Sequence, residues 1–229
     1  MSWSALLLSV ALLSPVPVAA APAPLPPLAV GDVVFIRVPF RPFVEVADAT
    51  GSWTNHVGVV VAVDGDEVQV AESTVPWSRR TPLARFVARS EGGRVAVRRP
   101  RQPLDDDARQ RLQAAVERRL HVRYDPGFDL ASRGQFCSRF VHEVLLDATG
   151  TAVGQVQTFE QLLQQRPGAK LGFWRWWFLG SIPWQRQTVT PASLLDSPQL
   201  APLFDGAVAP GADQSGSMPK ATSTRDTML

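Results

Sequence analysis

The chain is organised around the stretch Gln135-Phe136-Cys137-Ser138-Arg139-Phe140-Val141-His142-Glu143-Val144-Leu145, which contains the only cysteine of the protein. Apolar residues recur from Phe140 to Leu145 at the i, i+3, i+4 spacing of a half-buried helix, and Cys137 falls on the same stripe. Gly134, just upstream, is a natural break before a helix. The stretch therefore predicts a helix that begins near Cys137.

A cysteine at this position has two possible roles. At the N-terminus of a helix it lies near the positive end of the helix dipole and near unpaired backbone N–H groups. Both favour the thiolate, which is the nucleophilic form of the side chain. Free cysteine is also among the most buried residue types, so Cys137 is alternatively a small core residue. This segment alone leaves both interpretations open.

Composition limits the classes of protein to consider. The length of 229 residues suits one domain of roughly 150–200 residues. With 23 basic and 21 acidic side chains the net charge is +2, which gives no case for nucleic-acid binding. One cysteine excludes an internal disulfide framework. The single cysteine and three scattered histidines form no ligand cluster, so we expect neither a metal ion nor a cofactor.

The N-terminal part has the pattern of a secretory leader. The first 30 residues carry no charged side chain, and Ala5–Leu13 is an apolar run too short to span a bilayer. Val18 and Ala20 fit the small-residue pattern of a signal peptidase site. Residues 1–20 are therefore predicted to be a signal peptide of a periplasmic or secreted protein, with an N-terminal membrane anchor as the alternative.

The remaining chain divides by composition into three parts. Residues 21–28 form a proline-rich spacer, residues 29–205 the domain, and residues 206–229 a Gly-, Ala-, Ser- and Thr-rich tail that we expect to be disordered. Within the domain, Val30–Arg37 and Arg94–Arg99 predict strands, and Leu104–Leu120 and Thr158–Gln165 predict helices. Residues 81–86 predict a short helical or loop element, and residues 39–53 a long loop that forms a binding rim.

A β-hairpin is predicted from Asn55 to Glu72, with a turn near residues 64–66. A three-residue loop places Glu72 diagonally across from His56 on the same face of the sheet, within reach of a long side chain. A two-residue turn places Glu72 on the opposite face. The sequence leaves this register open.

Among the three histidines, His56 is the best candidate for a base that activates Cys137. His142 lies five residues after Cys137 on the predicted helix, roughly 140° around it, and is expected at the surface. His121 ends a predicted helix, where a structural role is common. His56 lies on a strand with a carboxylate, Glu72, available on the next one. A thiolate nucleophile needs such a base and a third group that orients it.

Four segments, in their order, resemble a known family: Gly31–Phe35, Asn55–Val59, Val70–Ser73 and Phe136–Val141. The family is the YiiX/YebB-like group of circularly permuted papain-fold cysteine hydrolases, in the NlpC-like superfamily. Its members have the histidine before the cysteine, as this chain does. The resemblance covers about residues 29–200 and implies an α+β fold, a small antiparallel sheet or half-barrel packed on the nucleophile helix.

The resemblance also implies roles for four residues. Cys137 is the nucleophile, His56 the general base, and Glu72 the residue that orients the imidazole. Tyr124, the only tyrosine, stands where such enzymes keep a tyrosine near the active site, and helps to hold the thiolate or oxyanion. No family motif covers the loop 38–53 or the Trp-rich segment 173–184, so we expect both to shape the substrate site.

The expected activity is amide hydrolysis by acyl transfer, with a peptide of the cell wall as first substrate. An N-acyl or lipid ester is the alternative, favoured by the aromatic residues between Phe173 and Trp184. That cluster caps a core, lines an apolar groove or contacts a membrane interface peripherally. A non-catalytic binding module that keeps the fold and a structural envelope protein are the hypotheses from other classes. The oligomeric state is not indicated.

Overall fold

The computed structural model describes residues 23–166 and 169–208. The predicted signal peptide lies outside the described residues. In chain order the strands and helices are β1 (Val33–Ile36), α1 (Arg41–Thr50), β2 (His56–Asp64), β3 (Glu67–Glu72), β4 (Arg79–Pro82), α2 (Leu83–Val87), a 3-10 turn (Glu91–Gly93), β5 (Arg94–Pro100), α3 (Asp106–Glu117), α4 (Cys137–Thr149), β6 (Gln157–Thr158), α5 (Phe159–Gln164), α6 (Leu171–Trp177), β7 (Gln187–Thr188), α7 (Pro191–Leu195) and β8 (Leu200–Ala207).

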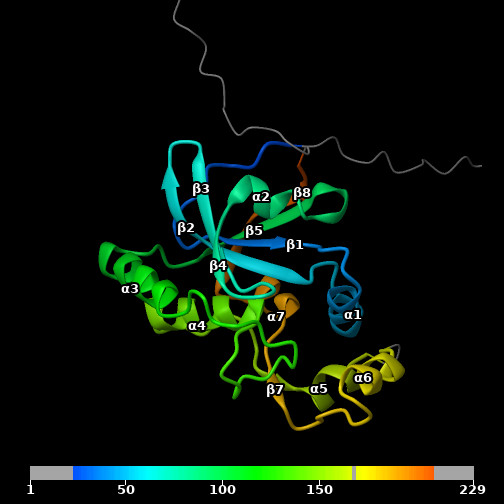
Figure 1. Ribbon diagram of the computed structural model, residues 1–229. Helices are drawn as coiled ribbons and strands as arrows, with labels where there is room; N and C mark the ends of the chain where they lie inside the picture. Colours follow the sequence, from blue (N-terminus) through cyan, green and yellow to red (C-terminus); the bar gives the residue numbers. More distant parts are fainter. Residues whose placement is uncertain (1–22, 167–168, 209–229) are drawn as a thin grey trace, which may run out of the picture.

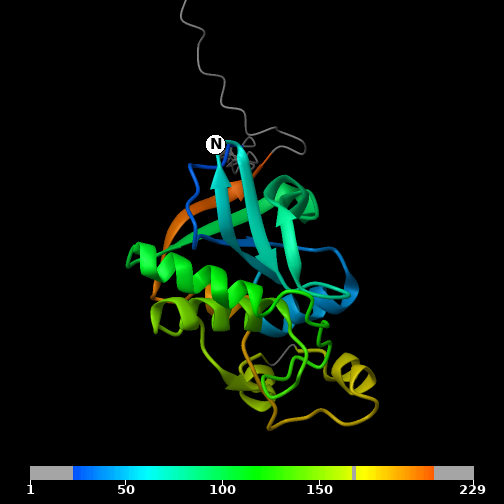
Figure 2. The ribbon, with the colours of Figure 1, turned by 60° about the vertical axis from the view of Figure 1, so that its left-hand side comes forward.

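Six strands form one sheet in the order β4-β3-β2-β1-β5-β8, and every neighbouring pair is antiparallel. Helices α3 and α4 lie side by side on one face of this sheet, and the short helix α2 covers the other face (Figure 1, Figure 2). Strands β6 and β7 form a separate two-stranded pair. The fold is therefore of the α+β class, as the sequence predicts.

The central strand β1 is buried on both sides, which explains its uninterrupted apolar sequence. Val33 and Phe35 belong to the core shared with α3 and α4. Val34 and Ile36 point to the other face, where they belong to the core around α2. Alternation along a strand thus divides the interior into two cores.

The predicted helix at Cys137 is confirmed as α4. Its apolar stripe, from Phe140 to Leu145, is fully buried between α3 and β2. The helix ends at Gly150, whose backbone is left-handed (φ 71°), a conformation that glycine adopts without a steric cost. The burial of this stripe fixes the position of the cysteine at the N-terminal end of the helix.

The predicted loop at residues 39–53 is wrong, because α1 occupies most of it. Pro42 stands in the first turn, where a missing N–H costs no hydrogen bond. Phe43, Ala47 and Ala49 are buried, and Gly51 ends the helix in the left-handed conformation. The proline at the start of this segment is typical of a loop in the sequence, although it also favours the start of a helix.

The predicted disordered tail begins too early, since β8 continues to Ala207 and Val208 is buried and its N–H donates to the carbonyl of Gly93. Gly206 and Ala207 continue β8 and pair with Val95 and Arg94 of β5, which satisfies their backbone groups. Residues 209–229 lie outside the described residues. In the predicted spacer, Leu25 is buried against the α2 core, so this part of it packs on the domain.

Within the described residues, no helix combines the length and the apolar character needed to cross a membrane.

Candidate active site

Cys137 is the first residue of α4 and is nearly buried, with 4% of its surface exposed. Its Sγ lies 4.0 Å from the backbone carbonyl oxygen of Asn55, the residue before β2. Phe136, in the N-cap position, offers no side chain that could accept from the first N–H groups of the helix. These amides, at the positive end of the helix dipole, are therefore available to a negatively charged group at Cys137.

His56 and Glu72 form a buried pair. The imidazole Nε2 lies 2.6 Å from Glu72 Oε2, and both side chains are fully shielded from solvent. His56 is the first residue of β2 and Glu72 the last of β3. A carboxylate in contact with one ring nitrogen fixes the orientation of the imidazole and leaves the other nitrogen to act on a partner.

Glu72 reaches His56 because of an irregularity in the hairpin. The turn has two residues, since Asp64 pairs with Glu67, and alone this register would put Glu72 on the wrong face. A bulge at Val61 then shifts the pairing by one residue. The shift returns Glu72 to the face of His56, which gives the diagonal arrangement expected for a three-residue loop.

The carboxylate of Glu72 is held from several sides. Thr81 Oγ1 donates to Oε1 at 2.7 Å, and Arg89 Nη2 donates to Oε2 at 2.7 Å. Burial would raise the pKa of Glu72, but the hydrogen bond and charge of His56, followed by Arg89, outweigh it and lower the pKa to about 2. Glu72 is therefore ionised throughout the neutral range.

The imidazole of His56 lies close to Cys137, whose Sγ is 4.0 Å from the carbonyl oxygen of Asn55, the residue that precedes His56. Burial opposes a charge on the ring, but the neighbouring Cys137 and Glu72 together outweigh it and raise the pKa of His56 to about 9. The ring nitrogen Nδ1 is buried and has no hydrogen-bond partner among the described residues. The ring of Phe43 stacks on the imidazole, with 6.0 Å between the two ring centroids. The carboxylate of Glu72 beside the ring therefore favours the protonated form of His56.

Tyr124 lies buried beside Cys137, and its hydroxyl has no hydrogen-bond partner among the described residues. Burial, followed by the negative charges of Cys137 and Asp125, raises the pKa of the phenol well above its ordinary value. The hydroxyl therefore stays protonated at neutral pH. It can donate a hydrogen bond to an oxygen that becomes negatively charged near Cys137.

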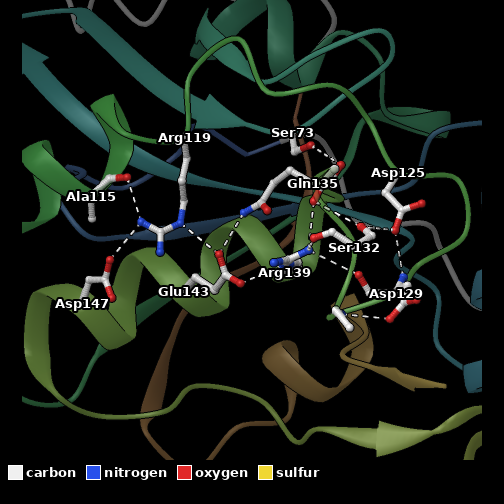
Figure 3. A network of polar contacts seen from close by, with 12 residues as sticks. Ser73, Ala115, Arg119, Asp125, Asp129, Ser132, Gln135, Arg139, Glu143 and Asp147 are labelled. Carbon is white, nitrogen blue, oxygen red and sulfur yellow. Dashed lines mark hydrogen bonds and ion pairs between the residues drawn. The ribbon is translucent and has the colours of Figure 1, made fainter. Parts of the chain in front are cut away.

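A polar network fixes the segment that leads into α4 (Figure 3). Glu143 accepts from Arg139 on its own helix at 2.7 Å and from Arg119, after α3, at 3.0 Å. The guanidinium of Arg139 also donates to the backbone carbonyls of Ser132 and Gly134, each at 2.9 Å. The network therefore joins α3, α4 and the preceding loop into one unit.

The same network extends to the strand that carries Glu72. Ser73 donates through its hydroxyl to the backbone carbonyl of Gln135 at 2.9 Å, two residues before Cys137 (Figure 3). The amide of Asp125 donates to the same carbonyl. The carbonyl of Gln135 thus links the residue after β3 to the segment before α4. This link helps to fix the position of Cys137 relative to Glu72.

Cys137 opens onto a narrow, mainly apolar pocket of about 430 Å³, its mouth included. Its walls come from α1, α4, α5, α6 and the start of α7. The residues that line it are Phe43, Val46, Ala49, Asn55, Tyr124, Phe128, Phe136, Cys137, Ser138, Phe159, Leu162, Trp174, Thr188, Val189, Thr190 and Pro191. Such a lining suits an apolar group of a substrate next to the sulfur.

The structure brings together all four residues selected from the sequence: Cys137, His56, Glu72 and Tyr124. The prediction for His142 is wrong, because it is buried and its Nδ1 lies 2.7 Å from the backbone carbonyl of Val153. That hydrogen bond satisfies the ring inside the protein. His121 is exposed, in the turn after α3.

Sequence reasoning missed the groups that support the pair and the pocket. Thr81 lies on β4, 9 positions after Glu72, and Arg89 follows α2, 17 positions after Glu72. Neither stands in a motif, so only the folded arrangement of β4 and of the turn after α2 reveals them. Phe43 was missed because its helix, α1, has the local sequence character of a loop.

Comparison with known proteins identifies the family and the fold. The model of one family, described as "Permuted papain-like amidase enzyme, YaeF/YiiX, C92 family", matches residues 27–204. The uncharacterized protein YiiX of Escherichia coli (strain K12) is 28% identical over 180 residues, which cover 76% of this chain and 88% of YiiX.

A solved structure is also similar. The crystal structure of the metalloprotein yiiX from Escherichia coli O157:H7 superposes with a TM-score of 0.68 at 26% identity, over 78% of this chain and 97% of that one. The predicted circularly permuted papain-like fold is confirmed. This chain belongs to the YaeF/YiiX family of permuted papain-like amidases.

Proposed function

We propose that this protein is a cysteine amidase that uses Cys137, His56 and Glu72 to cleave the amide of an N-acylated substrate. The observation that carries the proposal is the buried contact of 2.6 Å between His56 Nε2 and Glu72 Oε2, which leaves Nδ1 of the same ring without a partner among the described residues and available to Cys137 at the start of α4. A base oriented by a third group beside a nucleophile is the arrangement that activates a thiol.

The reaction follows from these positions. The thiolate of Cys137 attacks the amide carbonyl, and the oxyanion that forms accepts hydrogen bonds from the first amides of α4 and from the Tyr124 hydroxyl. The imidazolium of His56 gives its proton to the leaving amine, which departs and leaves a thioester on Cys137. His56 then takes a proton from water, whose attack releases the carboxylic acid and restores the thiolate.

The acyl group is the part of the substrate that the pocket selects. Its lining is apolar on the side of α1, α5 and α6, where Val46, Phe159, Leu162 and Trp174 lie. Each methylene buried there contributes about 0.8 kcal/mol to binding. These contacts favour an N-acyl chain over the polar stem peptide that the sequence put first.

A cell-wall peptide remains the second candidate because of a neighbouring groove. This groove shares Ala49, Leu162 and Thr190 with the apolar pocket and is lined mainly by polar side chains. They include four glutamines: Gln155, Gln157, Gln165 and Gln199. Amide and hydroxyl groups of this kind suit a peptide or sugar.

No step is routed through a metal ion. The solved relative from Escherichia coli O157:H7 is described as a metalloprotein. Among the described residues of this chain, no three His, Cys, Asp or Glu side chains lie together in a way that could hold a metal ion.

We also propose a periplasmic or secreted location, because residues 1–20 have the pattern of a leader.

The proposal predicts that kcat/KM for N-acyl amides increases with acyl-chain length. A series of N-acyl aminocoumarins from acetyl to dodecanoyl should show about a fourfold rise per methylene until the pocket is filled. Val46→Phe, which narrows the pocket, should lower hydrolysis of the long chains and leave that of the acetyl amide unchanged. Val44→Phe on the same helix, outside the pocket lining, is the matched control.

If kcat/KM does not change with acyl-chain length and the protein hydrolyses muropeptides, the acyl specificity is contradicted and the peptide candidate is favoured. Hydrolysis of neither substrate by a well-folded protein would contradict the amidase itself.

A further inference from the structure

An exposed apolar surface lies on α6 and on the residue before α1. Trp176 is 71% exposed, Leu179 96% and Phe40 55%. Phe40 and Trp176 line an open groove together with Phe173 and Trp177. Leu179 adjoins them, since its N–H donates to the carbonyl of Trp176 at 3.2 Å. Together, Phe40, Phe173, Trp176, Trp177 and Leu179 form the α6 patch.

The α6 patch is firmly attached to the domain. Trp174, on the inner side of α6, is buried and packs edge-on against Phe159 at 5.8 Å. Phe173 stacks on Trp177 at 5.8 Å, and the indole Nε1 of Trp177 donates to the carbonyl of Pro126 at 2.9 Å. The inner face of the helix is thus fixed, and the outer apolar side chains are held in solvent.

Two cationic side chains accompany the patch. Arg41 and Arg175 are exposed, and each is adjacent in sequence to a member of the patch. Within residues 23–166 and 169–208 neither guanidinium takes part in an ion pair, whereas the nearby Lys170 binds Asp48 at 2.9 Å. Tryptophan prefers the interface between lipid and water, and cations beside it are attracted to anionic headgroups.

The patch and the apolar pocket are built on the same two helices. Val46 of α1 and Trp174 of α6 wall the pocket of Cys137. Phe40, before α1, and Trp176 of α6 line the outer groove. Helices α1 and α6 lie near each other at one end of the molecule (Figure 1). A partner that binds the α6 patch therefore lies next to the helices that form the walls of the pocket.

We propose that the α6 patch docks on a lipid bilayer that contains anionic phospholipid. Trp176 and Leu179 enter the boundary between headgroups and acyl chains, while Arg41 and Arg175 contact the lipid phosphates. The patch combines exposed aromatic and aliphatic side chains with two arginines that form no ion pair among the described residues. This combination favours an anionic bilayer over an uncharged apolar partner. Docking is independent of the proposed reaction, because the Cys137→Ala variant retains the whole patch.

The test uses the full chain with Cys137→Ala and measures co-sedimentation with vesicles of phosphatidylglycerol and phosphatidylcholine. Replacing Trp176 and Leu179 together by serine should lower the partition coefficient about tenfold or more. Trp77→Ser is the matched control, since Trp77 is 51% exposed between β3 and β4, outside the patch, and should leave binding unchanged. Brominated lipid should quench the fluorescence of the parent more strongly than that of Trp176→Phe.

Charge is tested separately. Replacing Arg41 and Arg175 by glutamine should lower binding to the anionic vesicles about tenfold and leave binding to pure phosphatidylcholine unchanged. The proposal is overturned if the parent does not bind vesicles, or if the Trp176 and Leu179 double variant binds like the parent. It is also overturned if sedimentation equilibrium shows a dimer that this double variant dissociates, since a second copy then covers the patch.

Discussion

Replacing Cys137 by alanine is expected to abolish amide hydrolysis. The change removes the sulfur that attacks the carbonyl, and we expect kcat to fall by about 10⁵–10⁶-fold. Cys137 contributes little apolar volume at the edge of the pocket, so the midpoint of thermal unfolding should stay within a few degrees of the wild type. Steady-state hydrolysis of the best N-acyl amide and circular dichroism on the same samples measure both quantities.

Cys137→Ser is the matched control for shape. It keeps a side chain of nearly the same size and a hydroxyl in place of the thiol, which His56 cannot convert to a stable anion at neutral pH. We expect it to be almost as inactive as the alanine variant. Residual activity above a few per cent in folded Cys137→Ala would contradict the role of the sulfur.

Glu72→Gln is expected to have the second largest effect. The amide keeps the size of the carboxylate but cannot stabilise a positive charge on His56, so we expect kcat to fall by about 10³–10⁴-fold. It also leaves the guanidinium of Arg89 without its anion. Loss of one partner from a buried ionic cluster costs about 3–5 kcal/mol of unfolding free energy.

The pH dependence of stability gives an independent readout of this pair. The pKa of Glu72 is lowered to about 2, so its contribution is present above its ordinary pKa of 4.5 and is lost as the pH falls toward 2. The pKa of His56 is raised from 6.5 to about 9, so its contribution is present below pH 6.5 and is lost as the pH rises through 9. The combined contribution of Glu72 and His56 to the free energy of unfolding is therefore greatest between about pH 4.5 and 6.5.

In Glu72→Gln the acid limb of this profile should flatten, because the group that titrates is gone. Urea unfolding from pH 3 to pH 10 measures the profile. Glu67→Gln, on the exposed start of the same strand, is the control and should follow the wild type. A Glu72→Gln profile parallel to that of the wild type would show that the carboxylate is not coupled to folding through His56.

Most of the candidate site could be predicted from the sequence because its chemistry depends on residue types that are rare in this chain. One cysteine, one tyrosine and three histidines leave few combinations. What could not be predicted is the reason that Glu72 faces His56. A two-residue turn and a bulge at Val61 compensate each other, and sequence patterns specify neither.

The elements that the sequence missed are those whose stability comes from tertiary contacts. Helix α1 has a proline in its first turn and depends on the burial of Phe43 and its neighbours. Strand β8 contains Pro202 and Gly206, both unfavourable in strands, and forms because β5 offers an edge. Local propensity argues against both elements, and packing overrides it.

The aromatic segment illustrates the same limit. The sequence left three roles open for the residues from Phe173 to Phe178. The structure divides them by helix geometry, with Trp174 buried in the pocket wall and Trp176 in solvent. A core role and an exposed role thus coexist on one helix, because two residues along a helix are separated by about 200°.

The central claim is that His56 activates Cys137, and the rate of alkylation by iodoacetamide tests it most directly. Cys137 is the only cysteine, so the reaction reports on this site alone. Rates are measured from pH 4 to pH 10 in the wild type, in His56→Ala and in His121→Ala, an exposed histidine that serves as control. We predict fast alkylation well below about pH 8.5, the ordinary pKa of a free thiol, in the wild type and in His121→Ala. This low-pH reactivity should be lost in folded His56→Ala, while the rates converge near pH 10. Coincident profiles that rise near pH 8.5 in all three proteins would contradict the activated pair.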